Sequence, residues 1–425
     1  MRKRSSGRGA FLLARLAHVL WLRASLYTLA AAAVALLAFA LGPLVPTRLA
    51  EFVGEESSEE LLKMMGSSML AVAIFSLTAI VAAAGSITSN ASPRAAALLL
   101  EDKSAQTALS TFVAAFIFSI VGLVALGTGL YDASARFGLF CATLAVLAVV
   151  VIRLLGWMDQ VSRMSRVGAA VDQVEAALTD SLRRREPFLG GRPAPQAVSG
   201  IALHPARVGY VQNIDVGRLE EAAARHGLEV HVLVLPGSFL RLSRPILQVE
   251  GVDTIEDALA EQLLEAIVVG DQRTYPQDPR FGLVVLAEIA SRALSPALND
   301  PGTAVDVIGT ATRVLSVWGE QHWEEAPHPK FEHVTVRGLS AADCFEDVFA
   351  PIERDGAGFL EVGIALQKAY ADLGCSSANG FAEAARSRSA RALQLAKRAL
   401  PLIEDQRRLE ELAAEGTAPL PYRAF

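Results

Sequence analysis

Four long apolar segments lie in the N-terminal part of the chain, and no comparable segment follows them. They run from about Ala24 to Val45, Ser67 to Ser89, Ala108 to Leu130 and Phe137 to Leu155. About 20 apolar residues of α-helix cross the roughly 30 Å hydrocarbon core of a bilayer. The pattern therefore predicts a domain of four transmembrane helices over residues 24–157, with a basic N-terminus (1–23) before it and a large body after it.

The first apolar segment has a second interpretation, as a cleaved signal peptide. Ala38-Phe39-Ala40 has the small residues of a cleavage site. However, more than 20 residues precede the segment and three further apolar segments follow it, which favours a retained span.

The charges around the four segments predict their orientation. Six basic residues and no acidic residue precede the first segment, whereas the loop after it carries five glutamates against Arg48 and Lys63. By the positive-inside rule the N-terminus is cytoplasmic. Four spans return the chain to the same side, so we expect a bacterial inner (plasma) membrane protein with a cytoplasmic C-terminal body.

Small and polar residues recur on one face of the second and third segments. The faces comprise Ser76, Ala79, Ala83, Ser86 and Asn90 in the second, and Thr111, Ala115, Ser119 and Gly122 in the third. Such faces let membrane helices approach closely; alternatively, the second face lines a pore. No ionisable residue lies in the middle of a span, which argues against ion-coupled transport but leaves a passive channel possible.

The apolar period predicts an α+β body. An amphipathic helix is expected over Met158 to Arg185, within a stalk of residues 158–189, and a Gly/Pro-rich break around Pro187 to Pro195 ends it. A β-rich subdomain (196–252) follows, with strands at 208–216, 228–235 and 246–249 and a helix at 218–226 that Gly227 ends. A mainly helical subdomain (253–425) has expected helices at 254–267, with Asp253 as its cap, 281–294, 301 onward, 341–353, 359–373, 384–400 and 402–414, and a strand at 331–337.

Residues 236–249 suggest half of a biotinyl- or lipoyl-type hairpin sandwich. Attachment of a swinging cofactor needs a lysine at the hairpin tip, and the chain has none between Lys103 and Lys330. We therefore expect a small hairpin-sandwich-like unit with a structural or docking role.

The most unusual segment of the body is polar and runs from Gly270 to Ala304. Asp300 suits a helix N-cap and Pro301 the first helical position, so a well-capped corner between two helices is one interpretation. The other is a pocket in which a helix N-terminus and Arg273 attract an anion. The candidate pocket residues are Arg273, Gln277, Asp278, Arg292, Ser295, Asn299, Asp300 and Thr303.

Several of these motifs together resemble a known family. They are Gly209-Tyr210-Val211-Gln212, Arg273-Thr274 with Gln277-Asp278 and Phe281-Gly282, and Ser295-Pro296 with Asn299-Asp300-Pro301; Ser92-Pro93-Arg94 follows the second span. They are similar to the bacterial membrane protein family called domain of unknown function 2254. The chain departs from its pattern where Gly302 replaces an aromatic residue and Asn90-Ala91 replaces Gln-Phe. The resemblance implies four membrane helices and a cytoplasmic body, and it supplies no activity.

Nothing in the sequence indicates an enzyme, a metal site or a cofactor. No nucleotide-binding or hydrolase motif occurs, and His322, His328 and His333, with Glu324 and Glu325, do not have zinc-ligand spacing. The net charge of -6 does not suggest nucleic acid, and Cys141, Cys344 and Cys375 form no disulfide framework.

We expect a non-enzymatic integral membrane protein whose partners are the lipid bilayer and further copies of itself. Its body would bind a ligand or protein of unknown identity and bias the membrane helices. The alternative is a homo-oligomeric channel or pore lined by the second span.

Overall fold

The computed structural model describes residues 20–40, 55–100, 103–128, 133–164, 166–184, 192–193, 199–321 and 331–415. The chain divides into two compact units. Of the described residues, the membrane unit comprises those up to Ser89 and those from Ala96 to Ala169, and the body comprises those from Ala170 onward together with Asn90–Ala95. The short segment that follows the second apolar helix thus belongs to the body.

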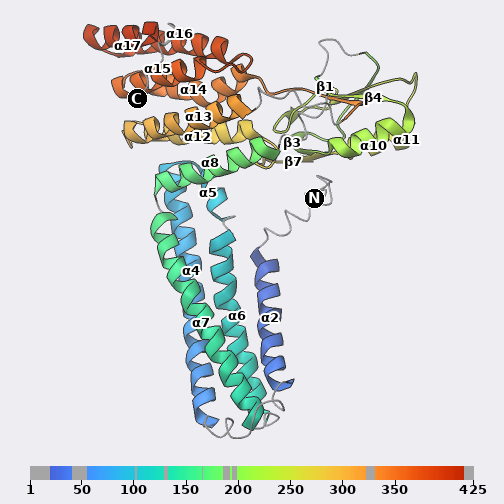
Figure 1. The fold of residues 1–425 in the computed structure, drawn as a ribbon, viewed down its shortest axis with the longest axis vertical. Coiled ribbons are helices and arrows are strands. Elements are labelled where there is room, and N and C mark those ends of the chain that lie inside the picture. Colours follow the sequence, from blue (N-terminus) through green and yellow to red (C-terminus); the bar gives the residue numbers. More distant parts are fainter. Residues whose placement is uncertain are drawn as a thin grey trace. The chain divides into compact units, whose positions relative to one another are not determined.

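The described part of the membrane unit is helical. Its helices are α2 (Leu20–Ala40), α4 (Glu55–Asn90), α5 (Pro93–Leu100), α6 (Lys103–Gly127) and α7 (Ala133–Met164), and α4, α6 and α7 run alongside one another in Figure 1. Three stretches are long and apolar enough to cross a membrane: Ser57–Asn90, Ser104–Gly127 and Ala133–Val161. Within α2 only Ser25–Val34 is recognised, as a shorter apolar helix, so three of the four expected spans are supported among the described residues.

Large apolar side chains cover the outside of these three helices. Ile74, Phe75 and Val81 of α4, Val124 of α6 and Ile152 of α7 are all exposed. A water-soluble protein rarely leaves such a continuous apolar surface open, whereas lipid tails solvate it. This surface and the lengths of the helices agree with insertion in a bilayer.

Small residues allow α4 and α6 to pack closely. A Cβ atom on Gly66 of α4 would lie 3.3 Å from the Ser119 Cβ of α6, and one on Gly122 would lie 3.1 Å from Leu62. Close approach at small residues is how membrane helices gain van der Waals contact without a hydrophobic driving force. The small face of the third span is therefore a packing surface.

The amphipathic helix expected over Met158 to Arg185 is not continuous. The fourth apolar helix, α7, extends to Met164, and a separate helix α8 (Val167–Arg184) follows. The apolar positions run through both helices without a change of period, so the sequence pattern contained no signal of the break.

The first half of the body contains two small β-sheets (Figure 1). The five-stranded sheet has the order β1-β8-β4-β6-β2, and the three-stranded sheet has the order β5-β3-β7. The strands are β1 (Arg192–Pro193), β2 (Ile201–Leu203), β3 (Gly209–Ile214), β4 (Glu229–Val232), β5 (Phe239–Leu240), β6 (Leu247–Glu250), β7 (Ile267–Gly270) and β8 (Val334–Val336). One apolar core joins both sheets and the helices α10 (Val216–His226) and α11 (Asp257–Leu264).

Two predictions about this region are wrong in detail. The expected hairpin does not form, because β5 pairs with β3 whereas β6 pairs with β2 and β4, so its two arms lie in different sheets. The helix expected from Thr254 begins only at Asp257, after the N-cap Glu256, and Ile267 belongs to β7. The end of α10 is as expected, because Gly227 adopts the left-handed conformation that favours glycine at a helix C-terminus.

The second half of the body is a stack of helices (Figure 1). They are α12 (Pro279–Ala293), α13 (Pro301–Gln321), α14 (Ala341–Asp355), α15 (Leu360–Gly374), α16 (Phe381–Ala399) and α17 (Ile403–Glu415). Phe345, Phe349, Tyr370 and Phe381 pack edge-to-face within it, a geometry that aromatic rings prefer. The observed helices match the expected ones to within a few residues.

Candidate functional site

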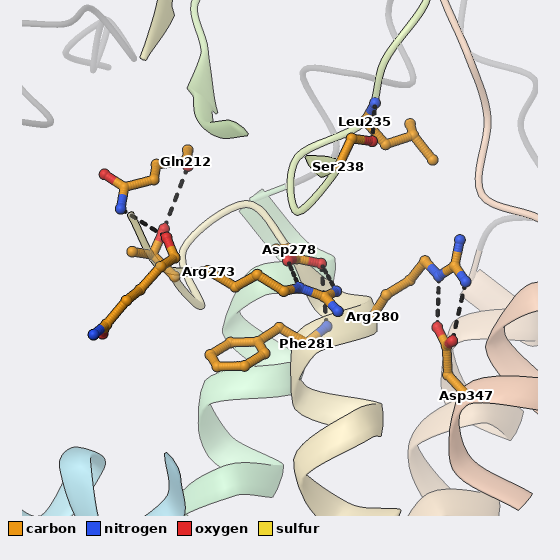
Figure 2. A network of polar contacts seen from close by, with 10 residues as sticks. Gln212, Leu235, Ser238, Arg273, Asp278, Arg280, Phe281 and Asp347 are labelled. Carbon is orange, nitrogen blue, oxygen red and sulfur yellow. Dashed lines mark hydrogen bonds and ion pairs between the residues drawn. The ribbon is translucent and has the colours of Figure 1, made fainter. Parts of the chain in front are cut away.

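The N-terminal end of α12 is organised by a buried ion pair between Arg273 and Asp278. The Asp278 carboxylate accepts hydrogen bonds from Arg273 Nε at 2.7 Å and Nη2 at 2.9 Å, and its side chain is only 2% exposed. It also caps α12 by accepting a bond from the backbone N–H of Phe281 at 3.1 Å. Figure 2 shows the Arg273 guanidinium between this carboxylate and the Phe281 ring, whose centroid lies 5.2 Å from Arg273 Cζ.

Burial dominates the electrostatics of this pair. Loss of hydration raises the pKa of Asp278 above its ordinary value, and the hydrogen bonds and charge of Arg273 offset part of that rise. A Cβ atom on Gly237 would lie 2.1 Å from Asp278 Oδ2, so only glycine allows the 237–238 turn to come this close. The carboxylate is thus enclosed by Arg273, the start of α12 and the turn before β5.

Two glutamines join the same segment to β3. Gln277 Oε1 accepts a hydrogen bond from the backbone N–H of Ile214 at 2.9 Å, and Gln212 Nε2 donates to the carbonyl of Gln272 at 2.8 Å. Thr274 Oγ1 lies 3.4 Å from the Gln212 carbonyl. The residues of the 209–212 motif therefore bond directly to residues of the 273–278 motif.

Arg280 extends these contacts to another helix. Its guanidinium donates to Asp347 of α14 at 2.5 Å and 3.0 Å (Figure 2). It also donates to Asp343 of the same helix at 3.0 Å. The hydrogen bond to Asp347, aided by both carboxylate charges, raises the pKa of Arg280. The first turn of α12 is thus bonded both to β3 and to α14.

The Asn299 corner is a separate structure at the other end of α12. Asn299 has φ +50°, a left-handed conformation that asparagine tolerates better than most residues. Asp300 caps α13, accepting bonds from the backbone N–H of Thr303 at 3.1 Å and from its hydroxyl at 2.6 Å. These hydrogen bonds lower the pKa of Asp300, and the expected N-cap and first-turn proline are confirmed.

The structure does not gather the eight candidate pocket residues in one place. Arg273, Gln277 and Asp278 lie at the N-terminal end of α12, whereas Arg292, Ser295, Asn299, Asp300 and Thr303 lie at or beyond its C-terminal end. Fifteen residues of α-helix separate the two groups by about 22 Å. Ser295 also donates to the carbonyl of Arg292 at 2.6 Å, as part of the helix end. A ligand role for either group stays a prediction.

The middle of α12 contacts the segment that follows α4. Ser92 Oγ donates a hydrogen bond to Glu288 Oε2 at 2.7 Å, and Arg94 forms an ion pair with Glu288 Oε1. Ser92 Oγ also accepts the backbone N–H of Arg94 at 3.1 Å, and the Tyr275 hydroxyl lies 3.4 Å from the Arg94 carbonyl. The Ser92-Pro93-Arg94 motif is thus held by α12 and by the loop before it. We call Ser92, Arg94, Tyr275 and Glu288 the linker contact.

A second buried charged cluster connects α14, α15 and α16. The Glu353 carboxylate, with a fully buried side chain, accepts hydrogen bonds from Tyr370 at 2.6 Å and from Arg388 Nε at 2.8 Å. Burial raises the pKa of Glu353 and raises that of Tyr370 well above its ordinary value. Because every partner belongs to the protein, this cluster holds three helices together. A pocket of about 100 Å³ lies beside it, lined by residues of α15, α16 and α17 that include Tyr370, Gln367 and Arg386.

The small face of α4 is only partly covered within the membrane unit. Ser76 and Ala83 are buried, Ala79 and Ser86 are half-buried, and Asn90 is exposed. Burial of Ser76 and Ala83 in a single chain agrees with a packing role. Lining of a pore, like homo-oligomerisation, stays a prediction that single-channel recording in bilayers would test.

Of the histidine-rich segment, only His333 lies within the described residues. Its Nδ1 lies 2.8 Å from Glu220 Oε1, a contact that joins the residue before β8 to α10. His322, His328, Glu324 and Glu325 lie outside the described residues. Within the described chain, no group of three or more His, Cys, Asp or Glu side chains could hold a metal ion.

Comparison with known proteins supplies the family. A family model described as "Predicted membrane protein (DUF2254)" matches residues 17–372, which include both the apolar helices and most of the body. The chain belongs to this family. The predicted resemblance to domain of unknown function 2254 is thereby confirmed.

Relatives of this DUF2254 protein have no assigned activity. Uncharacterized proteins of Mycobacterium bovis and of two strains of Mycobacterium tuberculosis are each 29% identical over 259 residues, or 57% of this chain. The chain spans about half the length (49%) of these curated relatives. No solved structure matches the chain.

Sequence reasoning missed the role of two carboxylates. No local pattern relates Glu288 to the Ser92-Pro93-Arg94 motif, because Ser92 lies 196 residues away in the sequence; only the fold brings the two together. Glu353 sits beside the apolar positions Val348, Phe349 and Ile352 of α14. An acidic residue on the buried side of an amphipathic helix was the available signal, because a buried charge requires a partner.

Proposed function

We propose that this protein is a non-enzymatic membrane protein whose body binds a ligand or partner and biases the membrane helices through the linker contact. Glu288, bonded to Ser92 and Arg94, is the observation that carries the proposal. A bacterial inner membrane with the body in the cytoplasm, as the charge pattern predicts, is the setting.

Chain connectivity makes the linker contact suitable for this role. Ser92 lies two residues after the end of α4, one of the three helices long enough to span a membrane. A hydrogen-bonded helix is stiff along its axis, so a shift of the bonded 92–94 segment moves the adjoining end of α4. Any event in the body that displaces α12 therefore acts on that end.

The contacts at the start of α12 connect this helix with the rest of the body. Gln277 bonds the segment before α12 to β3, and Arg280 bonds the first turn of α12 to α14. Arg273 holds the Asp278 cap of the same helix. A ligand that moves β3 or α14 would therefore also move α12, because hydrogen bonds connect them directly. The ligand itself is not specified by these contacts.

Hydrogen–deuterium exchange on the full-length protein in lipid nanodiscs tests the proposal. We expect Glu288→Ala to speed exchange of the last turns of α4, residues 80–90, by about tenfold or more, because a hydrogen bond to a charged group contributes about 1.5–3 kcal/mol. Glu288→Gln keeps an acceptor for Ser92 and should have a smaller effect. Ser92→Ala should reproduce part of the Glu288→Ala result.

A matched control is available in the body. Glu175 forms an ion pair with Arg313 whose side-chain exposures, 22% and 60%, resemble the 28% and 55% of Glu288 and Arg94. Glu175→Ala should leave exchange at residues 80–90 unchanged. If Glu288→Ala also leaves that exchange unchanged while the body stays folded, the linker contact does not act on α4.

A further inference from the structure

Two loops of the β-rich region form an exposed surface that combines arginines with large apolar side chains. Arg207 and Val208 lie in the loop between β2 and β3. Phe239 lies in β5, and Arg241, Leu242 and Arg244 lie in the loop between β5 and β6. Val208, Phe239 and Leu242 are 51%, 51% and 56% exposed, and the three arginines are exposed as well. We call these six residues the basic ledge.

The fold holds the two loops side by side. β3 pairs with β5, placing Gly209 opposite Leu240 and Tyr210 opposite Phe239, and the rings of Tyr210 and Phe239 meet edge-to-face at 5.1 Å. His204 Nδ1 lies 3.1 Å from the Leu242 carbonyl, and Ile246 N donates to the Leu203 carbonyl at 2.9 Å. The ledge is therefore a defined surface rather than a pair of independent loops.

The charge of the ledge is opposite to that of the whole chain. Residues 201–214 and 233–249 contain three arginines and no aspartate or glutamate, whereas the chain has a net charge of -6. Within the described part of the chain none of the three guanidinium groups has an ion-pair or hydrogen-bond partner. Asp271 follows the Gly270 that pairs with Tyr210, and the Asp278 carboxylate beside the Gly237 turn is paired with Arg273. The surface therefore keeps an excess of positive charge.

Unpaired arginines beside exposed apolar side chains match the chemistry of an anionic bilayer surface. Phosphate groups attract the guanidinium groups, and the apolar side chains can enter the boundary between headgroups and acyl chains. An anionic bilayer therefore offers favourable contacts to both the arginines and the apolar side chains of the ledge.

Chain connectivity joins one segment of the body directly to the end of a helix long enough to span a membrane. Asn90–Ala95 is part of the body and continues directly from α4. Its Arg94 carbonyl contacts Tyr275, in the loop that follows β7, and β7 shares the three-stranded sheet with β3 and β5. β7 ends at Gly270, which pairs with Tyr210 at the ledge end of β3, and Tyr275 follows Gly270 by five residues.

We propose that the basic ledge docks on the anionic headgroups of the bilayer in which the chain's own helices are inserted. No residue of the ledge belongs to the linker contact. Docking would make the position of the β-rich region responsive to the anionic lipid content of the membrane.

Exchange of the full-length protein in nanodiscs of neutral phosphatidylcholine and of mixed phosphatidylcholine and phosphatidylglycerol tests the proposal. We expect anionic lipid to slow exchange of amides in residues 204–209 and 239–245 about fivefold or more, since one basic residue near an anionic surface strengthens binding roughly fivefold. Added salt at 0.5 M should remove most of this protection, because exposed charges are screened.

Two variants separate the two halves of the ledge. Arg207→Gln, Arg241→Gln and Arg244→Gln combined should abolish the lipid-dependent protection, and Leu242→Ser should reduce it while leaving the charge unchanged. The control combines Arg398→Gln, Arg407→Gln and Arg408→Gln, three exposed arginines on α16 and α17. It removes the same charge elsewhere and should leave the protection intact.

Equal exchange in neutral and anionic nanodiscs would overturn the proposal. So would equal protection by inorganic phosphate in neutral nanodiscs, since that identifies a site for free anions. A loss of protection in the control variant would show a general charge effect and would also overturn it. Each outcome is independent of exchange at residues 80–90, which reports the linker contact.

Discussion

Removing Arg273 tests whether the buried Asp278 carboxylate depends on its partner. Arg273→Ala takes away two hydrogen bonds to Asp278, whose side chain is 2% exposed. Among the described residues, no other cation is hydrogen-bonded to this carboxylate. Breaking a buried ion pair by removing one member costs about 3–5 kcal/mol. Asp278 still caps α12 through Phe281, and a small rearrangement can admit water at the site of Arg273, whose side chain is 23% exposed. We therefore expect a loss at the low end of this range, about 3 kcal/mol in the free energy of unfolding.

The effect should depend on pH in a defined direction. Burial already raises the pKa of Asp278 in the folded protein, and Arg273 opposes that rise. Without Arg273 the folded-state pKa goes higher still. A group whose pKa is raised on folding stabilises the fold at low pH, and this contribution is lost as pH rises through the folded value. The variant should therefore be more destabilised at pH 8 than at pH 5.

Thermal unfolding of the full-length protein in detergent or nanodiscs, monitored by near-ultraviolet circular dichroism, measures the loss of stability at each pH. About 3 kcal/mol corresponds to a midpoint lower by roughly 6–12 °C for a unit of this size. The control is Arg354→Ala, which removes an arginine that is 70% exposed and pairs with the adjacent Asp355; an exposed pair contributes about 0–1 kcal/mol. A change below 2 °C at pH 8, or an equal change at both pH values, would refute the reasoning.

Two further predictions concern other carboxylates. Asp300→Ala should lower the free energy of unfolding by about 1 kcal/mol because it removes the N-cap of α13, whereas Asp300→Asn should keep most of that stability. Because folding lowers the pKa of Asp300, the stability that its carboxylate contributes is complete above the ordinary pKa and is lost as pH falls through the folded-state pKa. Thermal midpoints measured between pH 3 and 7 would show this loss. Glu353→Ala leaves Arg388 buried without its partner and should cost about 3–5 kcal/mol in denaturant unfolding. The combined Glu353→Gln and Arg388→Met variant should recover part of that loss, and additive effects of the two single changes would contradict a paired cluster.

The sequence alone determined the elements and their class. Apolar runs near 20 residues indicate membrane helices because the bilayer sets their length, and the period of apolar positions located most body helices because burial of one face imposes it. Asp300-Pro301 and Gly227 marked helix ends correctly, since capping is a local property of a few residues. The chain's own motifs also sufficed to place it in its family.

Only the tertiary structure decided which distant residues meet. Two candidate pocket groups, fewer than thirty residues apart in sequence, are separated because α12 stands between them. Ser92 and Glu288, 196 residues apart, lie in contact, and β5 and β6 entered different sheets although a turn alone joins them. Such pairings depend on how whole elements pack, which no local pattern encodes. The same physical reason explains why the basic ledge, assembled from two loops that are each unremarkable in sequence, was visible only in the folded chain.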